Sequence, residues 1–179
     1  VNCGFGNNDI ATLPRAAVDL EGGWITRPRP KTSEERRCPL WPETVEALRE
    51  VYASQPVPRD SRHKDLVFLT ADGLPLVRLK ARAPGEGEFA ISQRQDRIGD
   101  GFKRLLRKVG LRGGRGFYAF RHTFETIAGE SRDQVATNLI MGHVDSTMAG
   151  VYRERIDDAR LLAVVNYVRK WLFAEGQTE

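Results

Sequence analysis

The sequence predicts a mostly α-helical protein that carries one small three-stranded antiparallel sheet, an α+β fold. Apolar residues recur at helical spacing through the second half of the chain, for example over 98–109 and 157–173. Short strand-like runs bounded by turn residues occur only in the first half. A chain of 179 residues can bury a core of its own, so we expect one domain over residues 1–179.

Three runs of residues are expected to form the sheet. Residues 22–31 and 35–41 resemble two strands joined by the polar turn KTSEE, and LVFLT at 66–70 resembles the third strand. The segment 78–91 is basic, rich in glycine and proline, and has no periodicity. It is expected to be a long loop.

Capping residues and apolar spacing predict the helices. Pro42 suits the first position of a helix, Ser92 and Ser131 suit N-caps, and Gly110 suits the end of a helix. The acidic Asp157 suits the positive end of the last helix. The expected helices cover about residues 9–13, 42–52, 93–109, 117–129, 132–140, 147–153 and 157–173.

The composition favours a polyanionic partner. Lys and Arg number 28 against 24 Asp and Glu, which gives a net charge of +4. The arginines are clustered, which is typical of proteins that bind nucleic acids, although a merely basic surface would give the same count. The clusters are Arg27 with Arg29, Arg36 with Arg37, Arg104 with Arg107, and Arg112 with Arg115.

Cysteine and histidine usage argues against a disulfide framework and a metal site. Only two cysteines occur, Cys3 and Cys38, and the three histidines have no zinc-like spacing. A reducing, cytoplasmic location is therefore expected. No apolar run approaches the roughly 20 residues of a membrane span.

Four short stretches carry the candidate chemistry. PKTSEERRCPL places Lys31 on the expected hairpin, and GFYAFRHTF places Arg121 on a helix with Tyr118 three residues earlier. LIMGH places His143 at a helix end, and Tyr152 follows nine residues later. Taken singly, each residue has a structural explanation: Lys31 a turn lysine, Arg121 a solvated arginine or a partner of Glu125 four residues later, His143 a helix-end histidine, and Tyr152 a packed tyrosine.

In this order and spacing, the stretches resemble the catalytic domain of the tyrosine recombinases, the phage integrase family. The resemblance covers nearly the whole chain. It implies cleavage of double-stranded DNA by a tyrosine, through a 3′-phosphotyrosine, without metal, cofactor or ATP. It also implies self-association on DNA, as a tetramer in the family, a monomer for the isolated domain, association with the bacterial nucleoid, and an N-terminal DNA-binding domain outside this chain.

The resemblance assigns a role to each residue. Tyr152 is the nucleophile, Arg121 holds the phosphate, Lys31 is the general acid and His143 donates a hydrogen bond to a phosphate oxygen. Arginine forks suit charge on non-bridging oxygens, and an alkoxide leaving group needs a proton. Tyr118 stands where the family usually has histidine. The neighbouring His122 is expected to support the site from behind or to lie in the core.

The chain departs from the family at one arginine. The family's first arginine lies in a G-L-R-x-G-E segment, and the matching segment here is GFGNNDIATL, where Asp9 replaces the glutamate and Gly6 occupies the arginine position. Three alternatives follow: an impaired recombinase, a non-catalytic DNA-binding protein with the recombinase fold, and a topoisomerase of the same chemistry. Arg15, Arg27 and Arg29 are the nearest arginines that could compensate.

Overall fold

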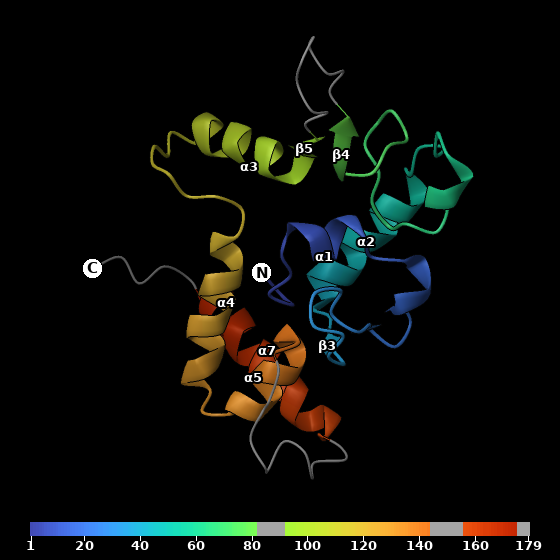
Figure 1. Cartoon of the computed structure of the whole chain (residues 1–179). Helices are drawn as coiled ribbons and strands as arrows, with labels where there is room; N and C mark the ends of the chain where they lie inside the picture. The colour runs from blue at the N-terminus through green and yellow to red at the C-terminus, as the bar shows by residue number, and fades with distance from the viewer. Residues whose placement is uncertain (82–91, 144–155, 175–179) are drawn as a thin grey trace. The chain divides into compact units, whose positions relative to one another are not determined.

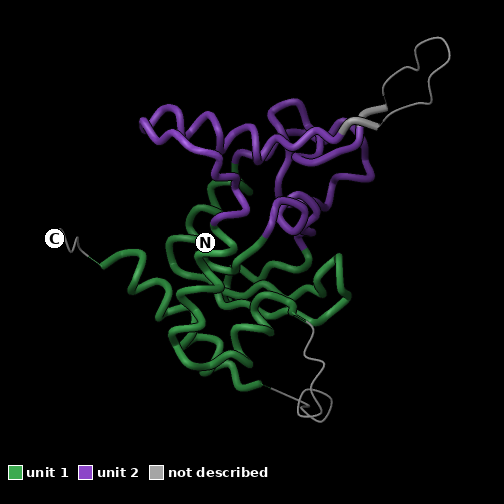
Figure 2. Tube along the Cα trace, turned by 60° about the vertical axis from the view of Figure 1, so that its left-hand side comes forward, with its two compact units in different colours: residues 1–5, 16–53, 120–179 green, residues 6–15, 54–119 purple. Residues whose placement is uncertain are grey.

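The computed structural model describes residues 1–81, 92–143 and 156–174. The chain divides into two compact units (Figure 2). Unit 1 comprises residues 1–5, 16–53 and 120–179, and unit 2 comprises residues 6–15 and 54–119. Because the chain passes from one unit to the other several times, neither unit is a continuous segment. The single domain expected from the sequence stays a prediction.

The small antiparallel sheet lies in unit 1. Its strands are β1 (Val18–Asp19), β2 (Trp24–Thr26) and β3 (Arg37–Pro39), in the order β1-β2-β3. Ile25 on β2 pairs with Cys38 on β3, and both side chains are buried. This confirms the predicted three-stranded antiparallel sheet, with strands shorter than expected because Pro28 and Pro30 cannot donate to a ladder.

The identity of the third strand was predicted wrongly. Residues 66–70 make only isolated bridges, Pro14 with Leu66 and Leu69 with Pro75, and belong to unit 2. Val67 is fully buried and its N–H donates to the carbonyl of Leu13 at 2.9 Å. Of this run only Val67 is buried, the others being half-buried, and the run forms an irregular segment while β1 completes the sheet.

Among the described residues, unit 1 also contains the helices α2 (Pro42–Ala53), α4 (Ala119–Glu130), α5 (Gln134–Met141) and α7 (Asp158–Phe173) (Figure 1). Helices α5 and α7 contact each other, and both contact β3. A tryptophan ties the loop before α2 to α7, since Trp41 Nε1 donates to the carbonyl of Val165 at 2.9 Å. The buried helical residues include Leu48, Phe124, Ile127, Ile140, Leu161, Val164, Val165 and Val168.

One predicted cap in unit 1 was wrong, and an aspartate takes its place. Asp133, not Ser131, caps α5 and accepts from the N–H of Ala136 at 3.0 Å. Ser131 instead donates to the carbonyl of Ala128 at the end of α4. Asp157 caps α7 as expected. A charged acceptor outcompetes a hydroxyl at the positive end of a helix.

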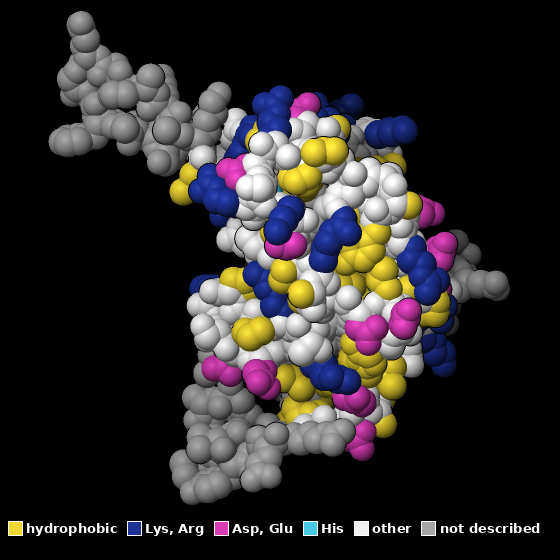
Figure 3. All heavy atoms as spheres, turned by 90° about the vertical axis from the view of Figure 1, so that its right-hand side faces the viewer, with side chains coloured by type: hydrophobic (Ala, Val, Ile, Leu, Met, Phe, Trp, Pro, Cys, Tyr) yellow, Lys and Arg dark blue, Asp and Glu magenta, His cyan; other side chains and the backbone are white. Residues whose placement is uncertain are grey.

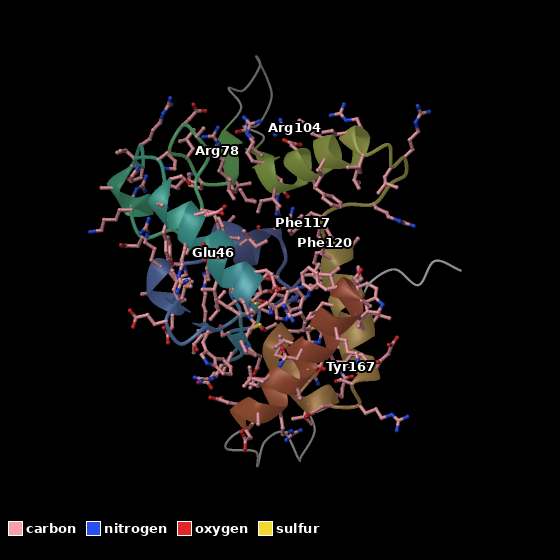
Figure 4. The ribbon with its side chains drawn as sticks, turned by 180° about the vertical axis from the view of Figure 1, so that it is seen from behind. Glu46, Arg78, Arg104, Phe117, Phe120 and Tyr167 are labelled. Atoms are coloured by element: carbon pink, nitrogen blue, oxygen red, sulfur yellow. The ribbon has the colours of Figure 1, made fainter. Side chains whose placement is uncertain are left out.

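Unit 2 contains α1 (Asn7–Ala11), the hairpin of β4 (Val77–Ala81) and β5 (Ser92–Asp96), and α3 (Arg97–Lys108). The described residues also form two 3-10 turns, η2 (Ser61–His63) in unit 2 and η1 (Arg15–Ala17), whose first residue belongs to unit 2 and whose other two belong to unit 1. Phe102 of α3 packs edge-on against Phe117, with ring centroids 5.8 Å apart (Figure 4).

The hairpin corrects two sequence predictions. Residues 78–81, expected to begin a loop, pair with β5, and Ser92, expected to cap a helix, begins β5. The helix starts later, where Asp96 accepts from the N–H of Gly99 at 2.9 Å. β5 has no apolar residue, and the short apolar–polar alternation of β4 (VRLKA) was overlooked because its residues adjoin the glycine- and proline-rich stretch that was expected to be a loop. Gly110, with φ +76°, follows α3 as predicted.

The described surface is mixed in character. On the face in Figure 3, Lys and Arg side chains are scattered among acidic and hydrophobic ones. Across residues 1–81, 92–143 and 156–174, no helix combines the length and apolar character that crossing a bilayer requires.

Candidate active site

Arg121 is a buried cation at the centre of the candidate site. Its side chain, on the first turn of α4, is 2% exposed. Nη1 donates to the carbonyl of Gly4 at 2.6 Å, and Nη2 donates to the carbonyl of Met141 at 2.9 Å. Nη2 also lies 2.9 Å from Nε2 of His143. A guanidinium held on several sides keeps one orientation, which is what binding a phosphate requires.

Local backbone conformation creates these acceptors. Gly4 has φ +57°, and a Cβ there would lie 3.0 Å from a ring carbon of Phe124, so only glycine brings its carbonyl to Arg121 without strain. Gly142 ends α5 with φ 62° and ψ 44°, and the N–H of His143 returns to the carbonyl of Asn138 at 2.9 Å. This left-handed cap leaves the carbonyls of Met141 and Gly142 open to other donors, at the negative end of the helix.

His143 is held in one tautomer by its neighbours. Arg121 has only N–H donors, so the 2.9 Å contact makes Nε2 of His143 the acceptor and places the ring proton on Nδ1. Nδ1 lies 3.9 Å from Oε1 of Glu125. Burial, the Arg121 charge and the Arg29 charge lower the pKa of His143, and Glu125 opposes them. The lowered pKa favours the neutral ring at pH 7. Donation from Nε2 to a phosphate requires Arg121 to release this nitrogen and Nε2 to carry a proton, either by a change of tautomer or by protonation of the ring.

We expect Glu125→Gln to lower the pKa of His143 further, because it removes the only raising influence named above. Since the folded pKa lies below the ordinary value near 6.5, the unfolded chain binds this proton more tightly. The free energy of unfolding should therefore fall as the pH drops from about 6.5 through the folded pKa, and His143→Gln should remove that part of the slope. NMR titration of the His143 ring and urea unfolding across pH measure both; a raised pKa in Glu125→Gln contradicts the assignment.

The connection between β2 and β3 brings Lys31 to the same helix end. Thr32 Oγ1 and Arg29 Nη1 each donate to the carbonyl of Gly142 at 3.3 Å. Lys31 lies between these two residues in the chain, and its side chain is exposed. The loop is thus attached to the residue that precedes His143, with Lys31 left open to solvent.

Tyr118 and Gly6 are neighbours in unit 2. Tyr118 lies in the turn before α4, not on the helix as predicted, and its side chain is 48% exposed. A Cβ on Gly6 would lie 3.4 Å from Cε2 of Tyr118 and 3.5 Å from Oδ2 of Asp9. The N–H of Gly6 donates to Asp9 at 2.9 Å, so Asp9 closes the start of α1 where the family has glutamate.

Two further sequence expectations have different outcomes. Tyr152, like the helix expected over 147–153, lies outside the described residues. His122 is exposed on α4, so the alternative that placed it in the core is wrong. Among the residues that the structure describes, no group of three or more His, Cys, Asp or Glu side chains could hold a metal ion.

Sequence reasoning missed the residues that organise the site. Gly4 and Gly142 act through their backbone conformation, and Thr32 acts through a single hydroxyl. Patterns of charged or apolar side chains do not identify such residues. The signal for Gly142 was present, because a glycine directly after an apolar helical run is a typical C-cap. Glu125 was considered a partner for Arg121, whereas its carboxylate lies near His143.

Solved structures with a similar fold include two of the Tn1549 transposon integrase. One, in complex with a circular intermediate DNA, has 20% identity and a TM-score of 0.60, covering 92% of this chain and 55% of its own. Another, with transposon right end DNA, has 18% identity and a TM-score of 0.60, covering 94% and 56%. XerA recombinase matches with 18% identity and a TM-score of 0.58, covering 94% and 54%.

No protein-family model matches the chain, and no curated protein matches it significantly. The chain spans about half the length of the solved structures named above. These neighbours are tyrosine recombinases, and the likeness extends over more than nine-tenths of this chain. The chain therefore has the fold of the tyrosine recombinase catalytic domain, as its sequence predicts.

Proposed function

We propose that this chain is the catalytic domain of a site-specific DNA recombinase that cleaves and rejoins DNA through a 3′-phosphotyrosine at Tyr152. The observation that carries the proposal is the buried Arg121, fixed by Gly4, Met141 and His143 in a chain of recombinase fold. The Tn1549 integrase neighbours were solved in complex with DNA, which supports a DNA substrate here.

The proposed chemistry uses side chains only. The Tyr152 hydroxyl oxygen forms a bond to phosphorus as the bond from phosphorus to the 5′-oxygen breaks, and the phenolic proton passes to water. Lys31 gives a proton to the departing 5′-oxygen. Arg121 stabilises charge on the non-bridging oxygens, and His143 donates to one of them once protonated. A 5′-hydroxyl from another strand reverses the reaction.

Exposed cations support binding of the DNA backbone. On α3 in unit 2, five lysine and arginine side chains are exposed and one aspartate accompanies them. Phosphate contacts of this kind give affinity that falls steeply with salt. Self-association on DNA and a cytoplasmic, nucleoid-associated location belong to the same proposal. The exposed cations of α3 are Arg97, Lys103, Arg104, Arg107 and Lys108.

A second candidate function is a DNA-binding protein without turnover. Gly6 favours it, because glycine offers no charge where the family has its first arginine. The retention of Lys31, Arg121, His143 and Tyr152 in one chain favours catalysis.

Replacing Tyr152 with phenylalanine separates the two candidates. The full-length protein is offered nicked duplexes that carry a site selected from random-sequence DNA by its own binding. Covalent adducts are then counted on denaturing gels. We expect adducts with the wild type and none with Tyr152→Phe, while duplex affinity changes less than about twofold, because only the nucleophilic oxygen is lost.

Tyr167→Phe is the matched control, since Tyr167 lies on α7 with its hydroxyl 3.3 Å from Glu130 (Figure 4). It should form adducts like the wild type. Adducts that persist in Tyr152→Phe would refute the nucleophile assignment. Binding by the wild type with no adduct at any nick would favour the non-catalytic alternative.

A further inference from the structure

Arg29 is held in place by the loop between β2 and β3. Its N–H donates to the carbonyl of Glu34 at 2.8 Å, and its own carbonyl accepts from the N–H groups of Thr32 and Ser33 at 3.2 and 2.8 Å. Ser33 adopts φ 59°, which closes the turn tightly. The backbone of Arg29 is thus anchored two residues before Lys31.

The stem of Arg29 lies across Gly142. A Cβ on Gly142 would come within 2.9 Å of Cβ and 3.1 Å of Cδ of Arg29, so the glycine makes room for the arginine. Gly142 also has φ +62°, so a larger residue there is disfavoured both by the contact with Arg29 and by the backbone conformation. The stem is therefore fixed at the end of α5, one residue before His143.

Toward the described residues, the guanidinium of Arg29 uses little of its capacity to donate hydrogen bonds. Within the part of the chain that the structure describes, its one hydrogen bond goes to the carbonyl of Gly142 at 3.3 Å. A donor–acceptor distance of 3.3 Å is long for an N–H group. A guanidinium has five N–H groups that can donate, so most of them are not used by this bond. The half-buried Arg29 also lowers the pKa of His143, as Arg121 does, so its charge reaches the site electrostatically.

Two other arginines of this hairpin, Arg36 and Arg37, already contact aromatic rings or a carboxylate. Arg36 is 2% exposed, with its guanidinium carbon 4.0 Å from the ring centroid of Phe5. Arg37 pairs with Asp158 at 2.7 Å and stacks over Trp24 at 4.2 Å. Arg29, by contrast, pairs with no carboxylate and stacks on no aromatic ring among the residues that the structure describes.

We propose that Arg29 binds the scissile phosphate together with Arg121, and so fulfils the role that the family gives to the arginine whose position is Gly6. The proposal rests on the proposed function for the identity of the phosphate. An incoming non-bridging oxygen replaces the weak bond to Gly142, and the anchored loop delivers Lys31 beside it. The position is new, because the arginine comes from the β2–β3 loop and not from the segment that contains α1.

A methylphosphonate scan tests the proposal by binding alone. The selected duplex is made with one neutral methylphosphonate at a time, and affinity is measured for full-length wild type, Arg29→Met, Arg29→Lys and Arg49→Ala. Methionine retains the stem over Gly142 without the charge. Arg49, exposed on α2 and 3.6 Å from Glu46, controls for net charge.

Neutralising the phosphate that Arg29 binds should weaken wild type and Arg49→Ala about tenfold, since a charged hydrogen bond is lost. For Arg29→Met, a methylphosphonate at that position should not change the affinity, and methylphosphonates at the other positions should weaken binding as they do for the wild type. The loss of affinity for Arg29→Lys at that position should lie between those of Arg29→Met and the wild type. Equal thermal unfolding of Arg29→Met and wild type confirms that the variant is folded. If folded Arg29→Met keeps every sensitivity of the wild type, the proposal is wrong.

Cleavage provides the second arm. The position at which a methylphosphonate no longer weakens binding by Arg29→Met should be the phosphate that becomes joined to the protein. Arg29→Met should cleave unmodified DNA at that phosphate about 10²–10³-fold more slowly than the wild type. A different position overturns the assignment to the scissile phosphate. An absence of adducts in the wild type refutes the proposed function, whereas the binding scan still decides whether Arg29 holds a phosphate.

Discussion

Replacing Arg121 with alanine is expected to slow DNA cleavage by at least about 10²–10³-fold and to lower the free energy of unfolding by roughly 3 kcal/mol. The kinetic loss follows from removing a fixed donor to the phosphate. The stability loss follows because the carbonyls of Gly4 and Met141 lose a charged donor in a buried place. Adduct formation rates and urea unfolding measure the two effects.

Arg121→Lys separates charge from shape. Lysine restores a cation to the buried site but cannot donate to two carbonyls in a fixed fork, so stability should recover more than cleavage. Arg169→Ala, which breaks the exposed pair with Glu43 on the surface of unit 1, should leave cleavage unchanged. Near wild-type cleavage by folded Arg121→Ala would remove Arg121 from the site.

The second large effect concerns Lys31. We expect Lys31→Ala to slow cleavage of ordinary DNA by about 10²–10⁴-fold, because the 5′-oxygen then leaves without a proton. A substrate with sulfur in place of that bridging oxygen should be cleaved at nearly the wild-type rate, since a thiolate leaves unaided. Rates of adduct formation on the two substrates give the answer directly.

Lys170→Ala, at an exposed position of α7, is the matched control and should cleave both substrates as the wild type does. If sulfur gives no rescue of Lys31→Ala, the lysine acts by binding or positioning and another group supplies the proton. The loop itself should stay attached in Lys31→Ala, because Thr32 and Arg29 hold it to Gly142.

Helices were easier to predict than strands, for physical reasons. The helix of residues 158–173 combines a capping aspartate with a buried stripe, so both signals agree. Strand β1 has two residues and its existence depends on pairing with β2, which no local pattern records. The pairing of β4 with β5 was missed because β5 is polar throughout and offers no apolar partner to the alternation in β4.

The sequence identified residues of the candidate site but not their burial or their contacts. The motifs identified Arg121 and His143, whose side chains lie 2.9 Å apart. They could not predict that Arg121 is buried, because its partners are the carbonyls of Gly4 and Met141 from distant parts of the chain. Nor could they select Arg29 over its neighbours, since that choice depends on the space over Gly142.

Identification of the DNA-linked peptide tests the central claim most directly. The full-length protein is trapped on the nicked selected duplex, digested with trypsin and nuclease, and analysed by mass spectrometry. The account predicts a nucleotide joined through its 3′-phosphate to Tyr152, within the tryptic peptide of residues 133–153. A nucleotide on any other residue, or duplex binding that never yields a linked peptide, would contradict it.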